Sequence, residues 1–140
     1  MHLIRVVLAL AAAALASAAA AQQAAPAPGY KIGIVNANRV IRDSKVSKDM
    51  YGKIEAEFKK REKEIEGGPK GEIERRKAAL AEDTDNRRAE ALKQFIEKAN
   101  ATIRRIAVAE KFDIVFLDAA YANPRIDLTD KVIREIDAGR

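Results

Sequence analysis

The sequence predicts an α+β protein in which a long antiparallel helical hairpin is inserted between the strands of a small β-rich oligomerisation body. Three observations lead to this prediction. Apolar residues recur at helical spacing through residues 45–110, where most other positions are Glu, Lys or Arg. Short strand-like runs stand on either side of this stretch. Its only strong helix breaker is Gly67-Gly68-Pro69-Lys70-Gly71.

Residues 1–21 are predicted to be a cleaved export signal. Arg5 precedes an apolar core at 6–16, and the small residues of 17–21 suit a signal peptidase. The apolar core is too short and too rich in alanine for a convincing membrane-spanning helix, although an uncleaved anchor is the alternative. Residues 22–30 contain no charge and two prolines, which is typical of a flexible leader. We therefore expect an exported protein that lies outside the cytoplasm; the resemblance described below implies the periplasm.

Residues 45–110 are predicted to form the hairpin arm. One apolar stripe precedes the glycines and a second follows them, and acid-before-base pairs at i,i+4 such as Glu57 with Arg61 support both helices. The tip is expected at 67–71, where two glycines precede a proline. The returning helix would then be the longer one. Either the body takes up that difference, or the tip lies near 83–86.

The body is predicted to consist of residues 31–44 and 111–140. Residues 114–117 are four apolar residues between aspartates, a pattern typical of a strand that is buried on both faces. A body of about 44 residues without cysteine cannot supply that cover alone, so several copies are expected to share one core. The residues expected in this oligomer core are Ile32, Ile34, Val35, Ile114, Val115, Phe116 and Leu117.

The composition argues against an enzyme. The chain has no cysteine, and its single histidine, His2, lies in the predicted signal, so Ser–His, Cys–His and His-metal sites are excluded from the mature chain. The aspartates at 113, 118, 127 and 130 lack the spacing of a calcium loop. We expect no catalytic residue, no cofactor and no metal. The mixed charge and few aromatic residues also argue against nucleic-acid binding.

Groups of basic residues along the helices are the candidate binding residues. They could attract acidic chains or acidic lipid head groups, because several arms brought together in an oligomer would sum their electrostatic fields. The alternative is that they only solvate a helix face, since acidic residues stand close to each group. The candidate binding residues, which become candidate client-binding residues under the resemblance given next, are Arg75, Arg76, Lys77, Arg87 and Arg88.

The two ends of the chain resemble the Skp/OmpH family of periplasmic chaperones. The resemblance rests on Lys31-Ile32-Gly33-Ile34-Val35-Asn36, on Phe112-Asp113-Ile114-Val115-Phe116-Leu117-Asp118, and on Asp127-Leu128-Thr129-Asp130. It implies a homotrimer with helical arms around a cavity that holds unfolded outer-membrane β-barrel proteins without ATP. The helical middle is shorter than is usual for the family, with the loss before Gly67. The function predicted is an ATP-independent holdase chaperone; the alternative is a non-catalytic coiled-coil scaffold of the cell envelope.

Overall fold

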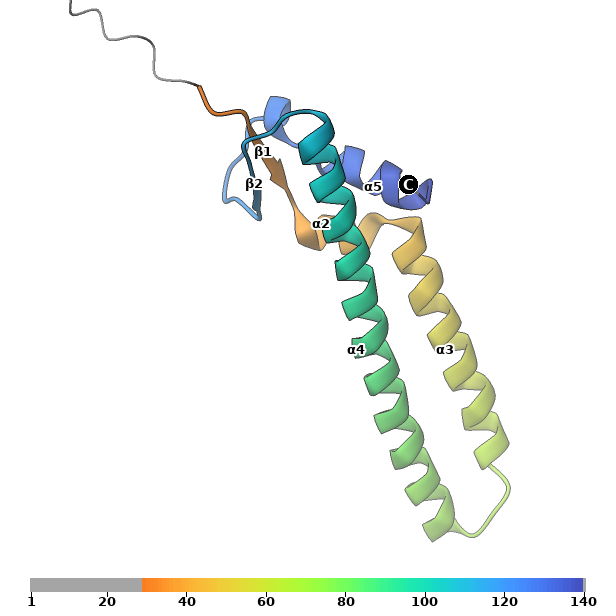
Figure 1. Ribbon diagram of the computed structural model, residues 1–140. Helices are drawn as coiled ribbons and strands as arrows, with labels where there is room; N and C mark the ends of the chain where they lie inside the picture. Colours follow the sequence, from red (N-terminus) through yellow and green to blue (C-terminus); the bar gives the residue numbers. More distant parts are fainter. Residues whose placement is uncertain (1–28, 140) are drawn as a thin grey trace, which may run out of the picture.

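The computed structural model describes residues 29–139, and the predicted export signal lies outside them. A hairpin of two long helices, α3 and α4, projects from a small body (Figure 1). None of the helices described is long and apolar enough to cross a membrane. In chain order the elements are β1 (Ile32–Val35), α2 (Ala37–Asp43), α3 (Lys45–Ile65), α4 (Lys70–Ala109), β2 (Ile114–Leu117), the 3-10 helix η2 (Pro124–Ile126) and α5 (Thr129–Asp137).

The body contains one small parallel sheet. β1 and β2 pair in register, with Ile32 opposite Ile114 and Val35 opposite Leu117, and the whole hairpin forms the connection between them. Each strand has four residues, whereas α2 and α5 together have sixteen, so the expectation of a β-rich body is wrong.

Helix α2 is not among the elements expected from the sequence. The helix begins because Asn36 caps it: its side-chain oxygen accepts the Arg39 N–H at 2.7 Å. The helix ends at Ser44, whose backbone is extended (φ −60°, ψ 133°). Seven residues with a single buried apolar side chain, Val40, show too little periodicity to predict a helix from the sequence.

Helix α4 belongs to both the arm and the body. Its C-terminal part contributes Phe95, Ala99 and Ile106 to the hydrophobic core. The extra length of the returning helix therefore packs into the body. The hydrophobic core includes residues before position 110, where the arm was expected to end. The other buried members of this core come from β1, α2, the residue before α5, and α5 itself: Val35, Val40, Leu128, Val132 and Ile136.

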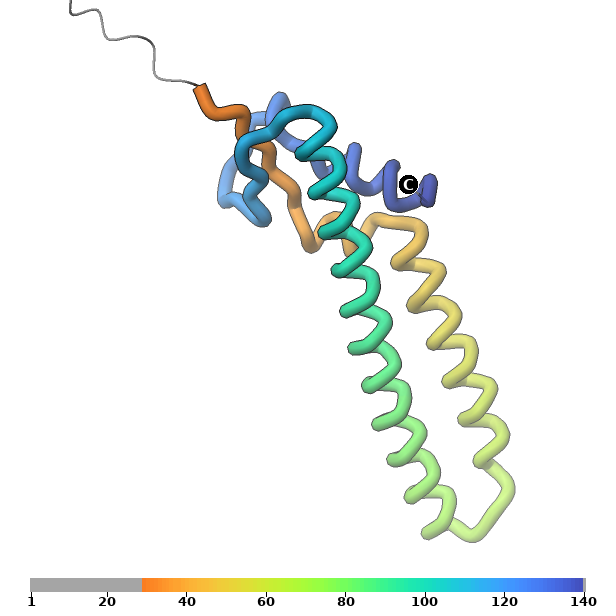
Figure 2. The backbone as a smooth tube through the Cα atoms, viewed as in Figure 1, coloured from red at the N-terminus to blue at the C-terminus, as the bar shows by residue number. Residues whose placement is uncertain are grey.

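The turn of the hairpin lies at residues 66–69. α3 ends at Ile65 and α4 begins at Lys70 with Pro69 in the N-cap position, where its missing N–H costs nothing (Figure 2). Residues 83–86 lie within α4. Beyond the turn, α3 and α4 run side by side back to the body (Figure 2).

The arm is joined to the body by a carboxylate from the C-terminal helix. Asp137 of α5 accepts the N–H groups of Lys45 and Val46 at the start of α3, each at 3.1 Å, and the Ser44 hydroxyl at 2.7 Å. Ser44 itself makes no capping hydrogen bond to α3. The start of α3 is therefore capped by a residue more than ninety positions away in the sequence.

Candidate functional site

Three arginines hold the two helices of the arm together. Arg61 contacts Asp83 at 3.0 Å, Arg87 contacts Glu57 at 3.2 Å, and Arg88 contacts Glu55 at 3.0 Å. Each pair joins α3 to α4. We call these the cross-arm ion pairs. They make Arg87 and Arg88 part of the hairpin's own structure, so these two are poor candidates for free client-binding residues.

The five predicted client-binding residues do not form one cluster. All of them lie on α4, but about eleven residues, or ~16 Å of helix, separate the group at 75–77 from the pair at 87–88. Arg76 is paired with Glu72 on its own helix. Arg75 and Lys77 make no ion pair with any residue that the structure describes, and Lys77 is partly buried near the hairpin seam.

Positive charge gathers at the end of the arm. Residues 59–77, which we call the tip segment, carry eight basic and five acidic residues, a net charge of +3. Residues 45–58 carry three of each sign, and residues 78–94 carry three basic and four acidic residues. The arm is therefore basic at its tip and close to neutral along its length, a distribution that becomes visible once the turn is placed at 66–69.

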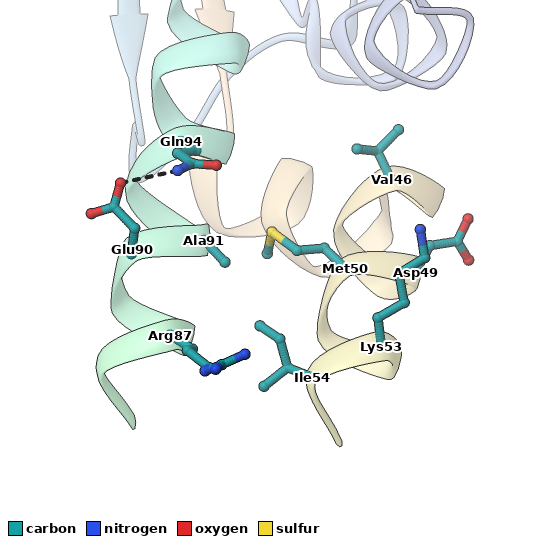
Figure 3. A pocket seen from close by; sticks show the side chains of 9 residues that line it. All are labelled: Val46, Asp49, Met50, Lys53, Ile54, Arg87, Glu90, Ala91 and Gln94. Carbon is teal, nitrogen blue, oxygen red and sulfur yellow. Dashed lines mark hydrogen bonds between the residues drawn. The ribbon is translucent and has the colours of Figure 1, made fainter. Parts of the chain in front are cut away.

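A groove opens between α3 and α4 near the root of the arm (Figure 3). It has a volume of about 650 Å³ and a mostly apolar floor. We call it the arm groove. Val46, Met50 and Ile54 of α3 and Ala91 of α4 form the floor. The α3 lip carries Asp49 and Lys53, whose charged ends point away from α4 in Figure 3. The α4 lip carries Arg87, Glu90 and Gln94, and the Glu90 carboxylate accepts the Gln94 amide N–H at 3.0 Å.

The arm groove exists because two residues on the seam of α4 do not fill it. On the tip side of it, Leu80 is buried beside Phe58 of α3, and on the body side Phe95 is buried in the hydrophobic core. Between them, position 87 is an arginine that turns toward α3 carboxylates, and position 91 is an alanine. A side chain that small leaves Met50 and Ile54 partly uncovered. The alanine is visible in the sequence, but the groove becomes visible only when α3 and α4 are paired.

A second apolar surface lies on the sheet. Ile32 and Ile34 of β1 stand beside Ile114 and Phe116 of β2 on the face that no helix of the same chain covers. We call these four residues the outer sheet face. Phe116 is 48% exposed and Ile114 is 43% exposed. Tyr30 adds to the same patch, which forms a concave apolar surface with Ile32, Ile114 and Phe116.

The predicted oligomer core divides into two parts. Val35 is fully buried inside the chain, and Val115 packs against the same intramolecular core. These two residues serve the fold of one chain. The other five remain accessible to different extents, with Leu117 51% exposed. β2 is therefore not buried on both faces within a single chain.

The four aspartates considered for calcium have local structural roles. Asp113 accepts the Lys31 N–H, Asp118 accepts the Ala37 N–H at 2.9 Å, and Asp127 accepts the Thr129 N–H at 2.8 Å. Hydrogen bonding from Thr129 lowers the pKa of Asp127, although partial burial opposes this. Asp130 contacts Arg39. Within residues 29–139, no group of acidic or histidine side chains is arranged to hold a metal ion.

Comparison with known proteins relates this fold to OmpH-like proteins. The family described as "Outer membrane protein (OmpH-like)" matches residues 69–136, which span α4, the sheet strand β2 and most of α5. A crystal structure of an OmpH-like protein from Caulobacter crescentus CB15, a candidate outer membrane chaperone, superposes with a TM-score of 0.51 at 18% identity. That superposition covers 84% of this chain and 90% of the other. No curated protein sequence matches. The resemblance to the OmpH-like family that the sequence indicated is confirmed.

Proposed function

We propose that this OmpH-like protein is an ATP-independent holdase of the periplasm that binds unfolded outer-membrane β-barrel proteins between its helical arms. The observation that carries the proposal is the hairpin arm itself: two long helices project from a small body and leave an apolar groove open near the root of the arm. The OmpH-like match over the returning helix and the body supports the same function.

A holdase needs many weak contacts with a chain that has no fixed shape. The arm offers two kinds of contact. The tip segment carries a net charge of +3 and can attract acidic chains from a distance. The arm groove and the partly exposed apolar residues that line it can take over at close range. Acidic lipid head groups would also be attracted by the tip segment.

Assembly into a homotrimer is part of the proposal. The outer sheet face leaves large apolar side chains exposed in a single chain, and a parallel sheet is normally covered on both faces. Packing of this face against other copies would cover it and would bring several arms around one space. The number three comes from the family resemblance, and the need for cover comes from the exposed side chains.

The test is an aggregation assay. An unfolded outer-membrane β-barrel protein is diluted from urea into buffer with the mature protein, with and without ATP, and light scattering is followed. We expect suppression of scattering at a stoichiometric ratio of trimer to client, and no effect of ATP. Co-migration of client and protein in size-exclusion chromatography checks that the complex is soluble.

The envelope-scaffold alternative gives a different result in the same assay. A scaffold protein would leave the scattering curve of the unfolded client unchanged at every ratio, although it would still associate through its outer sheet face. That outcome would reject the holdase function and leave the assembly intact.

A further inference from the structure

We propose that the arm groove binds its client as an extended segment whose side chains alternate between apolar and polar. This inference rests on the holdase function proposed above and names the conformation that the site accepts. The occupant is a stretch of unfolded β-barrel chain, whose membrane-spanning strands carry this alternation along their length.

The spacing of the groove floor fits such a segment. Val46, Met50 and Ile54 stand four residues apart on α3, which places them about 6 Å from one another along the helix axis. In an extended chain every second side chain points to the same side, at intervals of about 6.6 Å. Successive apolar side chains of the segment would therefore meet successive floor residues over this length of α3.

The lips of the groove carry groups that can form hydrogen bonds with an extended backbone. Such a backbone presents unpaired N–H and C=O groups along both edges. Asp49 and Lys53 have flexible side chains that can turn toward the groove, where the carboxylate would accept from the N–H groups and the ammonium group would donate to the C=O groups. Glu90 accepts one hydrogen bond from Gln94, and its remaining lone pairs can accept from the segment. Neither Asp49 nor Lys53 makes an ion pair with any described residue, so both are available. A helical segment would pair its own backbone groups and gain nothing from these lips.

The experiment fills the groove and leaves the rest of the arm unchanged. Ala91→Met places a larger apolar side chain on the floor, next to Met50. Ala89→Met is the matched control, because Ala89 is an exposed alanine on α4 only two residues away and does not line the groove. Both variants are compared with the wild type in binding a fluorescein-labelled peptide of about ten residues with alternating apolar and polar side chains, the length of one barrel strand.

We expect Ala91→Met to weaken peptide binding about tenfold, the change that follows from losing the burial of one apolar side chain. Ala89→Met should bind like the wild type. A peptide of the same composition with its apolar residues in a single block should bind about tenfold more weakly than the alternating peptide to the wild type. Equal affinity for the two peptides would overturn the extended conformation, and equal binding by the two methionine variants would overturn the groove as the site.

A second readout does not depend on the stability of the Ala91→Met variant. The chain has no cysteine, so Lys53→Cys places a single environment-sensitive dye on the lip of the groove. Lys48→Cys places the same dye on an exposed position of α3 that does not line the groove. Adding unfolded client should shift the emission at position 53 to the blue and leave position 48 unchanged. If client is held in solution and neither dye responds, the groove proposal fails and the holdase stands; if no client is held, the holdase fails and the groove proposal fails with it.

Discussion

The Asp137 carboxylate accepts the Ser44 hydroxyl at 2.7 Å and, through the same carboxylate, the first two N–H groups of α3. Ser44 is fully buried and marks the break between α2 and α3. The first helix of the arm is thus held at its root by the last helix of the body. Because the first N–H groups of a helix have no partner within it, this contact decides whether α3 begins at Lys45.

We predict that Asp137→Ala destabilises the protein by about 1 kcal/mol, within the usual range for loss of a helix cap. Asp137→Asn should cost less, because the amide oxygen can still accept one of the hydrogen bonds. Urea denaturation followed by circular dichroism measures both values. Glu97→Ala, an exposed position on α4, is the control and should lie within about 0.5 kcal/mol of the wild type. Equal stability of Asp137→Ala and Glu97→Ala would contradict the capping role.

The same carboxylate should make stability depend on pH. Partial burial acts to raise the pKa of Asp137, but the hydrogen bonds from Ser44, Lys45 and Val46 outweigh it, so the pKa is lowered on folding. The pKa of Asp127 is lowered as well, chiefly by hydrogen bonding from Thr129. Groups with a lowered pKa stabilise the fold above the unfolded value of about 3.9, and this stabilisation is lost as the pH falls through the lower folded value.

We therefore expect the urea midpoint to be steady near neutral pH and to fall as the pH drops below about 4. Asp137→Asn should flatten that decline, because the amide does not titrate in this range. The measurement is the urea midpoint of both proteins at a series of pH values between neutrality and acid. A decline of the same size in the variant would show that Asp137 does not contribute to it.

The cross-arm ion pairs lead to a prediction that separates structural from client-binding arginines. Arg87→Gln with Arg88→Gln removes two pairs between α3 and α4 and should destabilise the hairpin by about 1 kcal/mol, since such exposed pairs contribute a fraction of that each. The loss should shrink at high salt, where the pairs are already screened. Faster hydrogen exchange in residues 50–61 would report the loosened arm.

Arg75→Gln with Lys77→Gln is the matched control for that experiment. Neither residue makes an ion pair with a described residue, so stability should change by no more than about 0.5 kcal/mol. Because both belong to the basic tip segment, capture of an acidic unfolded client should slow and depend less on salt. Stopped-flow fluorescence at two salt concentrations measures the rate. The electrostatic role of the tip would be rejected if the rate matched that of the wild type at both.

The sequence predicted the hairpin well because its signals are local. The spacing of Met50, Ile54 and Leu80 and the breaker at 67–71 depend only on neighbours along the chain. The cap from Asp137 could not be predicted in this way, because its partners are more than ninety residues distant. Charge patterns along the sequence also placed Arg87 and Arg88 in one candidate group with Arg75, because such patterns do not show contacts between helices. The partners of Arg87 and Arg88 on α3 become visible only when the two helices are paired.

The outer sheet face is the surface that we expect an assembly to cover. Phe116 is 48% exposed in the single chain and lies beside Ile34 on a face that no helix of the chain covers. If other copies cover this face, Phe116→Asp buries an unpaired carboxylate at the interface, which costs several kcal/mol. We expect the variant to lose its assembly and part of its stability together, because the exposed apolar face would then be left in water.

Val108→Asp is the control for this change. Val108 is 75% exposed on α4, outside the sheet, so the same charge should leave both mass and stability unchanged. Sedimentation equilibrium of the mature wild-type protein and of both variants gives the mass of each assembly. A trimer that persists in Phe116→Asp would show that the outer sheet face is not the interface. A monomeric wild-type protein would show that this apolar face stays open in solution, and it would then have to be considered as a surface for clients.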